Sequence, residues 1–116
     1  MKAPYAILLN ICFLSFTLSQ VQLGSDIDGE AAGDKSGGFA ISLDSDGNRL
    51  AIGAPYNDGG GADAGHVRIY SWNGISWSQL GADIDGEATG DLFGRSVSLD
   101  SDGDRVAIGA ILNDGN

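Results

Sequence analysis

The sequence predicts an all-β protein made of four-stranded antiparallel meanders, the blades of a partial β-propeller. The first reason is an internal repeat: residues 23–34 and 80–91 are identical at ten of twelve positions. Residues 43–54 and 99–110 are a second pair of copies, again with ten of twelve positions identical. The second reason is that each unit contains short apolar runs of period two, separated by tight-turn signals. A repeat of this length filled with strands is typical of propeller blades and other modular arrays.

Two runs in each unit predict a β-hairpin. In the first unit they are residues 39–43 and 49–53, and in the second unit they are 95–99 and 105–109. An Asp-Gly dipeptide lies between the two runs of both units. Because glycine adopts a positive φ without steric cost, Asp-Gly between alternating runs is a strong hairpin signal.

The first unit continues with a third and a fourth run. Residues 66–72 alternate so that Val67 and Ile69 face one side and the residues between them face the other. The Asn-Gly at 73–74 then turns the chain into a fourth run at 76–80. The two tryptophans that flank this turn are expected to pack across the strands.

The N-terminus predicts a secretory signal. Lys2 precedes an apolar run of about 14 residues, shorter than the roughly 20 that span a bilayer, and small residues stand before Gln20. We therefore expect a signal peptide helix at 1–19 and a secreted or cell-surface repeat region at 20–116. Within that region we expect a strand of a preceding blade at 20–27, repeat one at about 34–83 and an incomplete repeat two at about 91–116.

The composition argues against several classes of function. Sixteen acidic residues against six basic ones give a net charge of −10 at pH 7, which disfavours nucleic acid and anionic membranes as partners. We expect no membrane insertion after the signal is cleaved. The one cysteine, Cys12, lies in the predicted signal, and His66 is the single histidine, so zinc and thiol chemistry are disfavoured. We expect His66 to occupy an ordinary surface or rim position at the head of a strand.

The chain holds fewer than two complete units, whereas closed propellers have four to eight blades. We interpret it as the N-terminal part of a longer array or as a truncated product. Its strand edges would need further blades or self-association to cover them.

The motifs in this repeat region resemble the FG-GAP repeat, the blade unit of integrin α-subunit propellers. The second unit has Phe-Gly at 93–94, a strand, and then Gly-Ala at 109–110, while the first unit has the complete Gly-Ala-Pro at 53–55. The departures are an extra residue and no Phe-Gly pair at 36–39, and Ile111 in place of the proline.

The resemblance implies an adhesion-like function. We expect a non-enzymatic module that binds an extracellular protein or a glycan through loops at the blade ends. One alternative is a fragment of a propeller enzyme, a hydrolase or lyase, whose site lies in blades outside this sequence. Another is a truncated, non-functional product.

Alternating carboxylates in the two hairpin turns are candidate calcium ligands. Ca²⁺ takes six to eight oxygen ligands, and turns supply both carboxylate and carbonyl oxygens. Family members that bind calcium carry the pattern DxDxDGxxD with glycine sixth, whereas glycine is fourth here. The ligands are therefore not carried over from the resemblance, and the alternative is that Asp-Gly only closes each turn. No other cofactor is expected, and the candidate ligands are Asp44, Asp46, Asp100, Asp102 and Asp104.

Overall fold

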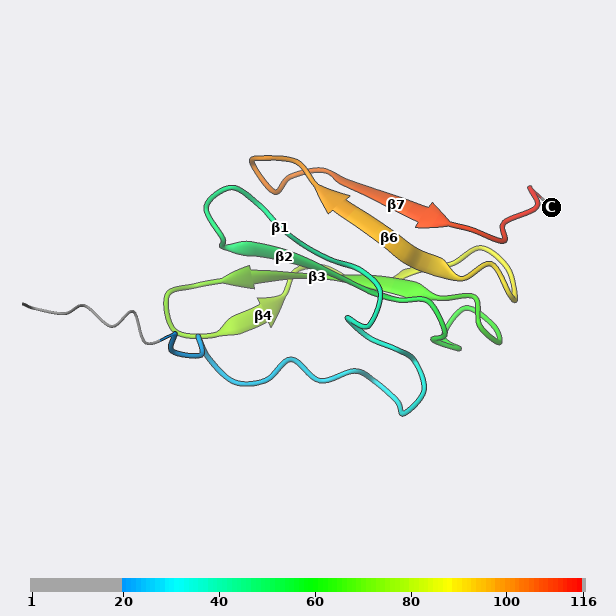
Figure 1. Cartoon of the computed structure of the whole chain (residues 1–116), viewed down its shortest axis with the longest axis horizontal. Coiled ribbons are helices and arrows are strands. Elements are labelled where there is room, and N and C mark those ends of the chain that lie inside the picture. Colours follow the sequence, from blue (N-terminus) through cyan, green and yellow to red (C-terminus); the bar gives the residue numbers. More distant parts are fainter. Residues whose placement is uncertain (1–19, 116) are drawn as a thin grey trace, which may run out of the picture.

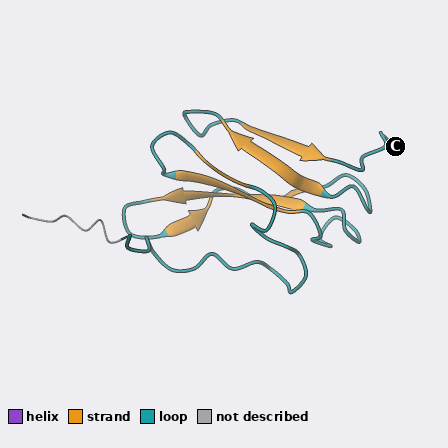
Figure 2. Cartoon of the chain, in the orientation of Figure 1, coloured by secondary structure: helices purple, strands orange, loops and turns teal. Residues whose placement is uncertain are grey.

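The structure, a computed structural model, describes residues 20–115. The predicted signal peptide at 1–19 lies outside the described residues. Strands joined by turns and loops account for the described chain (Figure 2), as the sequence predicts for an all-β fold. None of the described residues belongs to a helix that could cross a membrane.

The first unit forms one antiparallel sheet in which strands follow one another in chain order (Figure 1). Leu43 pairs with Leu50, and Trp72 pairs with Trp77 across the last hairpin. The two tryptophan rings lie 5.4 Å apart between centroids, which confirms the expected cross-strand packing. The predicted four-stranded meander is therefore present, and its strands are β1 (Ile41–Leu43), β2 (Arg49–Ala54), β3 (His66–Trp72) and β4 (Trp77–Gln79).

A further short strand, β5 (Ile84–Asp85), was not expected from the sequence. It pairs with His66 and Val67 at the start of β3, beyond the part of β3 that β4 covers. Its two residues are too few to show an alternating pattern, and its pairing depends on a strand that lies well before it in the chain.

The second unit contributes a hairpin of β6 (Phe93–Leu99) and β7 (Val106–Ala110), as predicted. β1 is shorter than its counterpart β6 because the first unit has Gly-Gly before Phe39 in place of a Phe-Gly pair. Gly37 has a φ of +68°. Its N–H donates to the carbonyl of Gly53, and the N–H of Gly53 donates to the carbonyl of Ala40. These two hydrogen bonds do not extend β1.

Residues 20–27 form no strand, in contrast to the expected strand of a preceding blade. The segment lies beside the last hairpin of the first sheet instead: a Cβ on Gly24 would lie 2.9 Å from a ring carbon of Trp72. The described chain holds no preceding sheet with which this segment could pair.

One face of the first sheet is covered by β6. Ala51 and Val67 have no exposed area and lie on this face. The predicted alternation in β3 is thus confirmed, since Val67 and Ile69 share the covered side. On the opposite face Ile41 and Leu43 are 64% and 56% exposed.

The two units meet through glycines on β2 and β6. A Cβ on Gly53 would overlap the carbonyl oxygen of Gly94, and a Cβ on Gly94 would lie 2.6 Å from the carbonyl oxygen of His66. Only glycine allows backbones to approach this closely. Gly53 belongs to the Gly-Ala-Pro of the first unit and Gly94 to the Phe-Gly of the second, so the two short motifs meet at the boundary between units.

Hydrogen bonds join the two units on both sides of this glycine contact. At one end the N–H and Oγ of Ser45 both donate to the carbonyl of Ser101, at 3.1 and 2.7 Å. At the other end the N–H of Phe93 donates to the carbonyl of Ala64 at 2.9 Å. The second hairpin is therefore held at a fixed position on the first sheet.

Gly53→Ala is expected to destabilise the full chain by about 3 kcal/mol, because backbones must move apart to admit the methyl group. The matched control is Gly109→Ala, the same repeat position in the second unit. There the added Cβ would meet the hydroxyl of Ser96, which can rotate away, so a cost below about 1 kcal/mol is expected. Urea unfolding of both variants measures the difference. Equal costs would show that the Gly53 contact does not limit the packing of the units.

Candidate functional site

The turns and loops that carry the candidate polar residues lie at two opposite ends of the sheets (Figure 1). We call one the hairpin end, formed by the β1–β2 turn at 44–48 and the β6–β7 turn at 100–104. We call the other the loop end, formed by residues 29–38, 55–65 and 83–92.

At the hairpin end, the first aspartate of each turn closes that turn. Asp44 Oδ1 accepts hydrogen bonds from the backbone N–H groups of Asn48 and Arg49, at 2.9 and 3.0 Å. Asp100 Oδ1 accepts from the residues four and five positions further on, at 3.1 and 3.2 Å. Side chains that bond to their own turn in this way are common in tight turns.

The predicted calcium ligands of the second unit lie together. One carboxylate oxygen from each of Asp100, Asp102 and Asp104 lies within 4.8 Å of the others. The hydrogen bond to Asp100, together with repulsion from that carboxylate, raises the pKa of Asp104. Among the described residues Asp44 and Asp46 belong to no such group, since Asn48 stands in the first unit where the second has its third aspartate.

At the loop end, Asn57 joins two acidic side chains of the N-terminal segment. Its Nδ2 donates to Asp34 Oδ2 at 2.8 Å and to Glu30 Oε2 at 3.1 Å, and its Oδ1 accepts from the N–H of Gly59. Asn57 and Asp34 are 3% and 6% exposed. We call these three side chains, Glu30, Asp34 and Asn57, the amide clamp.

The second unit repeats this clamp. Asn113 Nδ2 donates to Asp91 Oδ2 at 3.0 Å and to Glu87 Oε2 at 3.4 Å, and its Oδ1 accepts from the N–H of Gly115. The clamp was not predicted from the sequence. The recurrence of the same glutamate, aspartate and asparagine in both units was the signal that could have revealed it.

Beside the clamp of the first unit lies an ion pair. Arg68 donates from Nε and Nη2 to the two carboxylate oxygens of Asp83, at 2.7 and 2.8 Å, and its Nη2 is 3.2 Å from Glu30 Oε2. This bidentate hydrogen bond lowers the pKa of Asp83 to about 2 and raises the pKa of Arg68 above its ordinary value. Gln79 Nε2 donates to the same carboxylate.

His66 is buried next to this ion pair, so the expected surface or rim position is wrong. The residue is 3% exposed. β3 is an interior strand at this point, with Ala54 of β2 on one side and Asp85 of β5 on the other. No hydrogen bond partner in the described chain reaches Nδ1 of His66.

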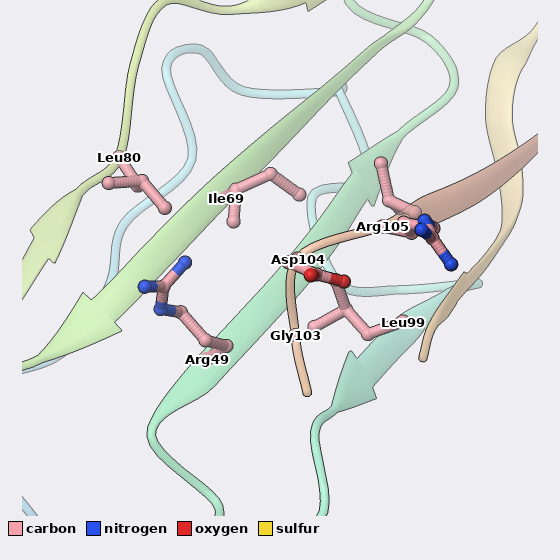
Figure 3. A pocket seen from close by; sticks show the side chains of 8 residues that line it. Arg49, Ile69, Leu80, Leu99, Gly103, Asp104 and Arg105 are labelled. Atoms are coloured by element: carbon pink, nitrogen blue, oxygen red, sulfur yellow. The ribbon is translucent and has the colours of Figure 1, made fainter. Parts of the chain in front are cut away.

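Two shallow pockets accompany these groups. One, of about 210 Å³, lies over the amide clamp and is also lined by Ala31, Asp58 and Gly59. The other, of about 250 Å³, lies between the units near the hairpin end (Figure 3). Its wall combines apolar side chains of both units with charged groups. The apolar side chains are Ile69, Leu80, Leu99 and Val106, and the charged groups are Arg49, Asp104 and Arg105.

A four-stranded antiparallel meander and the hairpin of a near-identical sequence repeat, stacked through backbone contacts, define a β-repeat protein with partial propeller blades. Residues 82–116 match the family model of the FG-GAP repeat. The second unit is thus an FG-GAP repeat, which confirms the resemblance inferred from the sequence. No curated protein and no solved structure matches the chain.

Replacing Asp83 by asparagine is expected to remove a stabilisation that depends on pH. Because the pKa of Asp83 is lowered from 3.8 to about 2 in the folded chain, the ion pair stabilises the fold fully above the ordinary pKa and loses this effect as the pH falls toward 2. Melting temperatures of the full chain and of Asp83→Asn should therefore converge on acidification from about pH 5 to about pH 2. Asp46→Asn, at an exposed turn position, is the control. A difference in melting temperature between the wild-type chain and Asp83→Asn that stays constant with pH would contradict the lowered pKa of Asp83.

Calcium binding at Asp100, Asp102 and Asp104 stays a prediction, and it has a direct test. Calcium at about ten times its Kd should stabilise the chelator-treated full chain by about 1.4 kcal/mol, seen as a raised melting temperature. Asp102→Asn should lose this rise, and sodium chloride of the same ionic strength should not reproduce it. If calcium at millimolar concentration leaves the melting temperature unchanged, the prediction of a calcium site at these three aspartates is wrong.

Proposed function

We propose that the chain is a non-catalytic module of a secreted or cell-surface β-propeller, and that it binds an extracellular protein or a glycan through its loop end. The observation that carries this proposal is the FG-GAP repeat at residues 82–116, because such repeats are typical of extracellular and cell-surface proteins. The stacking of the two units supports it further. The loops that follow β2 and precede β6 project from the same end, where one ligand can contact both.

Charge indicates what kind of group the loop end would contact. The pocket over the amide clamp is lined by Glu30, Asp34 and Asp58, and the whole chain has a net charge of −10. An acidic surface of this kind is complementary to basic side chains of a protein or to amino groups of a glycan. Asp58 is exposed at the rim of the pocket, where a ligand can reach it.

The repeated clamp favours a binding scaffold over an enzyme. A catalytic site needs polar groups that differ from blade to blade and converge on one substrate. Here the glutamate, aspartate and asparagine of the clamp occur in both units, where the asparagine bonds to both carboxylates and to a backbone N–H group. Their contacts fix loop conformation, which is what a rigid binding surface requires.

The test is to screen the immobilised full chain against a glycan array and a panel of extracellular proteins. We expect to find a ligand whose affinity falls as the salt concentration rises, because salt screens interactions between exposed charges. Asp58→Asn should reduce its affinity about two- to fivefold, as for the loss of one exposed ion pair. Asp46→Asn, at the hairpin end, is the matched control and should bind normally. The absence of any ligand in both screens, or equal losses in both variants, would contradict the proposal.

A further inference from the structure

We propose that Glu30, His66 and Asp83 bind a divalent transition-metal ion of the zinc class, with the carboxylate of Asp85 beside it. One ligand atom from each of the first three residues lies within 4.8 Å of the others. The three come from separate parts of the chain: the N-terminal segment, the start of β3, and the residues before β5. This cluster lies at the loop end and shares no residue with the candidate calcium ligands.

His66 provides the observation that points to an ion. Its side chain is 4% exposed, and its Nδ1 faces the carboxylates of Glu30, Asp83 and Asp85 at 3.8, 3.8 and 3.9 Å. These distances are too long for hydrogen bonds, so Nδ1 is a buried polar atom without a partner in the described chain. Such an atom costs about 1–3 kcal/mol when it is left unsatisfied. A cation between the ring and the carboxylates would satisfy Nδ1 through its lone pair.

The distances from His66 Nδ1 to its two carboxylate neighbours fit a metal ion after a small contraction. Zinc bonds of 2.0–2.1 Å in tetrahedral geometry place neighbouring ligand atoms about 3.3 Å apart. The distances of 3.8 Å from Nδ1 to Glu30 and Asp83 exceed this value by about half an ångström. Glu30 is half-exposed, with 51% of its side chain accessible, so its carboxylate can make this movement.

The charge around His66 also favours a divalent cation. Glu30, Asp83 and Asp85 carry three negative charges at neutral pH, and Arg68 is the cation paired with two of them. With a neutral imidazole the group therefore keeps a net charge of −2. A divalent ion would neutralise it, whereas a protonated histidine would leave one negative charge.

Neighbouring side chains already hold two of the ligands in place. Asn57 donates to Glu30, and Arg68 and Gln79 donate to Asp83. Each carboxylate oxygen has two lone pairs. Asp83 Oδ2 accepts a hydrogen bond from Arg68, and Glu30 Oε2 accepts one from Asn57 and lies 3.2 Å from Arg68 Nη2. Hydrogen bonds of this kind orient metal ligands in known sites.

The ligand types select the metal. An imidazole nitrogen with carboxylate oxygens suits zinc and similar first-row ions, while Ca²⁺ takes oxygen ligands. The composition had argued against zinc because the chain has one histidine and one cysteine. Nitrogen and sulfur ligands alone are too few for a zinc site, but the fold adds carboxylate ligands from segments far apart in the sequence.

The test uses Co²⁺ as a spectroscopic probe and Zn²⁺ as its competitor, with the full chain in excess calcium so that carboxylate-only sites are occupied. We expect visible absorption from one bound Co²⁺, its displacement by Zn²⁺, and a higher melting temperature with Zn²⁺. Glu30→Gln and His66→Gln should each weaken Zn²⁺ binding more than about tenfold. The matched control is Glu87→Gln, which changes the equivalent clamp residue of the second unit, where no histidine stands nearby in the sequence.

Two results would overturn the proposal. One is the absence of a Co²⁺ spectrum and of Zn²⁺ binding in the wild-type chain. The other is an equal loss of Zn²⁺ affinity in Glu30→Gln and Glu87→Gln, which would indicate adsorption to acidic loops. If His66→Gln does not fold, the comparison of the two glutamate variants still decides, because both positions are partly exposed and their circular dichroism spectra report folding.

Discussion

The close approach of Gly53 and Gly94 is the constraint on which the rest of the structure depends. Backbone atoms of two units meet there without side chains between them, so the separation of the sheets is fixed by hard-core repulsion and not by the choice of side chain. Once that distance is set, Val67 is fully buried beneath β6 and the hydrogen bonds from Ser45 and Phe93 reach their acceptors in the neighbouring unit. The loops of the two units then lie at the same end of the sheets, because close packing holds the strands that carry them in position.

This constraint explains why much of the fold could be predicted from the sequence. Strand alternation and Asp-Gly turns are local signals, and they correctly located the two hairpins and the direction in which Val67 and Ile69 face. The recurrence of near-identical segments correctly indicated stacked units. Residues 20–27 form no strand in the described chain, because a strand forms only where a partner strand is available and no preceding sheet is present there. That they belong to a preceding blade stays a prediction.

The polar sites were predicted less well because they depend on long-range contacts. Asp100, Asp102 and Asp104 lie in one turn, so their proximity followed from the sequence. The clamp joins Glu30 to Asn57 across 27 positions. His66 is buried next to β5 and the N-terminal segment, and no local sequence pattern predicts these contacts. Burial of a strand end depends on what the neighbouring segments cover, and an alternation pattern does not contain that information.

The amide clamp is the polar feature that the two units have in common. Both have an amide clamp that fixes the loop end, but in the described chain one of the clamp glutamates, Glu30, also lies beside a histidine and an arginine. The hydrogen bonds of the clamp are therefore common to both units. In the first unit, His66 and Arg68 lie beside the clamp and form a compact charged cluster with its glutamate. The side chain of His66 lies on the face of β3 opposite Val67, the side chain that packs toward Gly94, so a site can form there while the contact between Gly53 and Gly94 is kept.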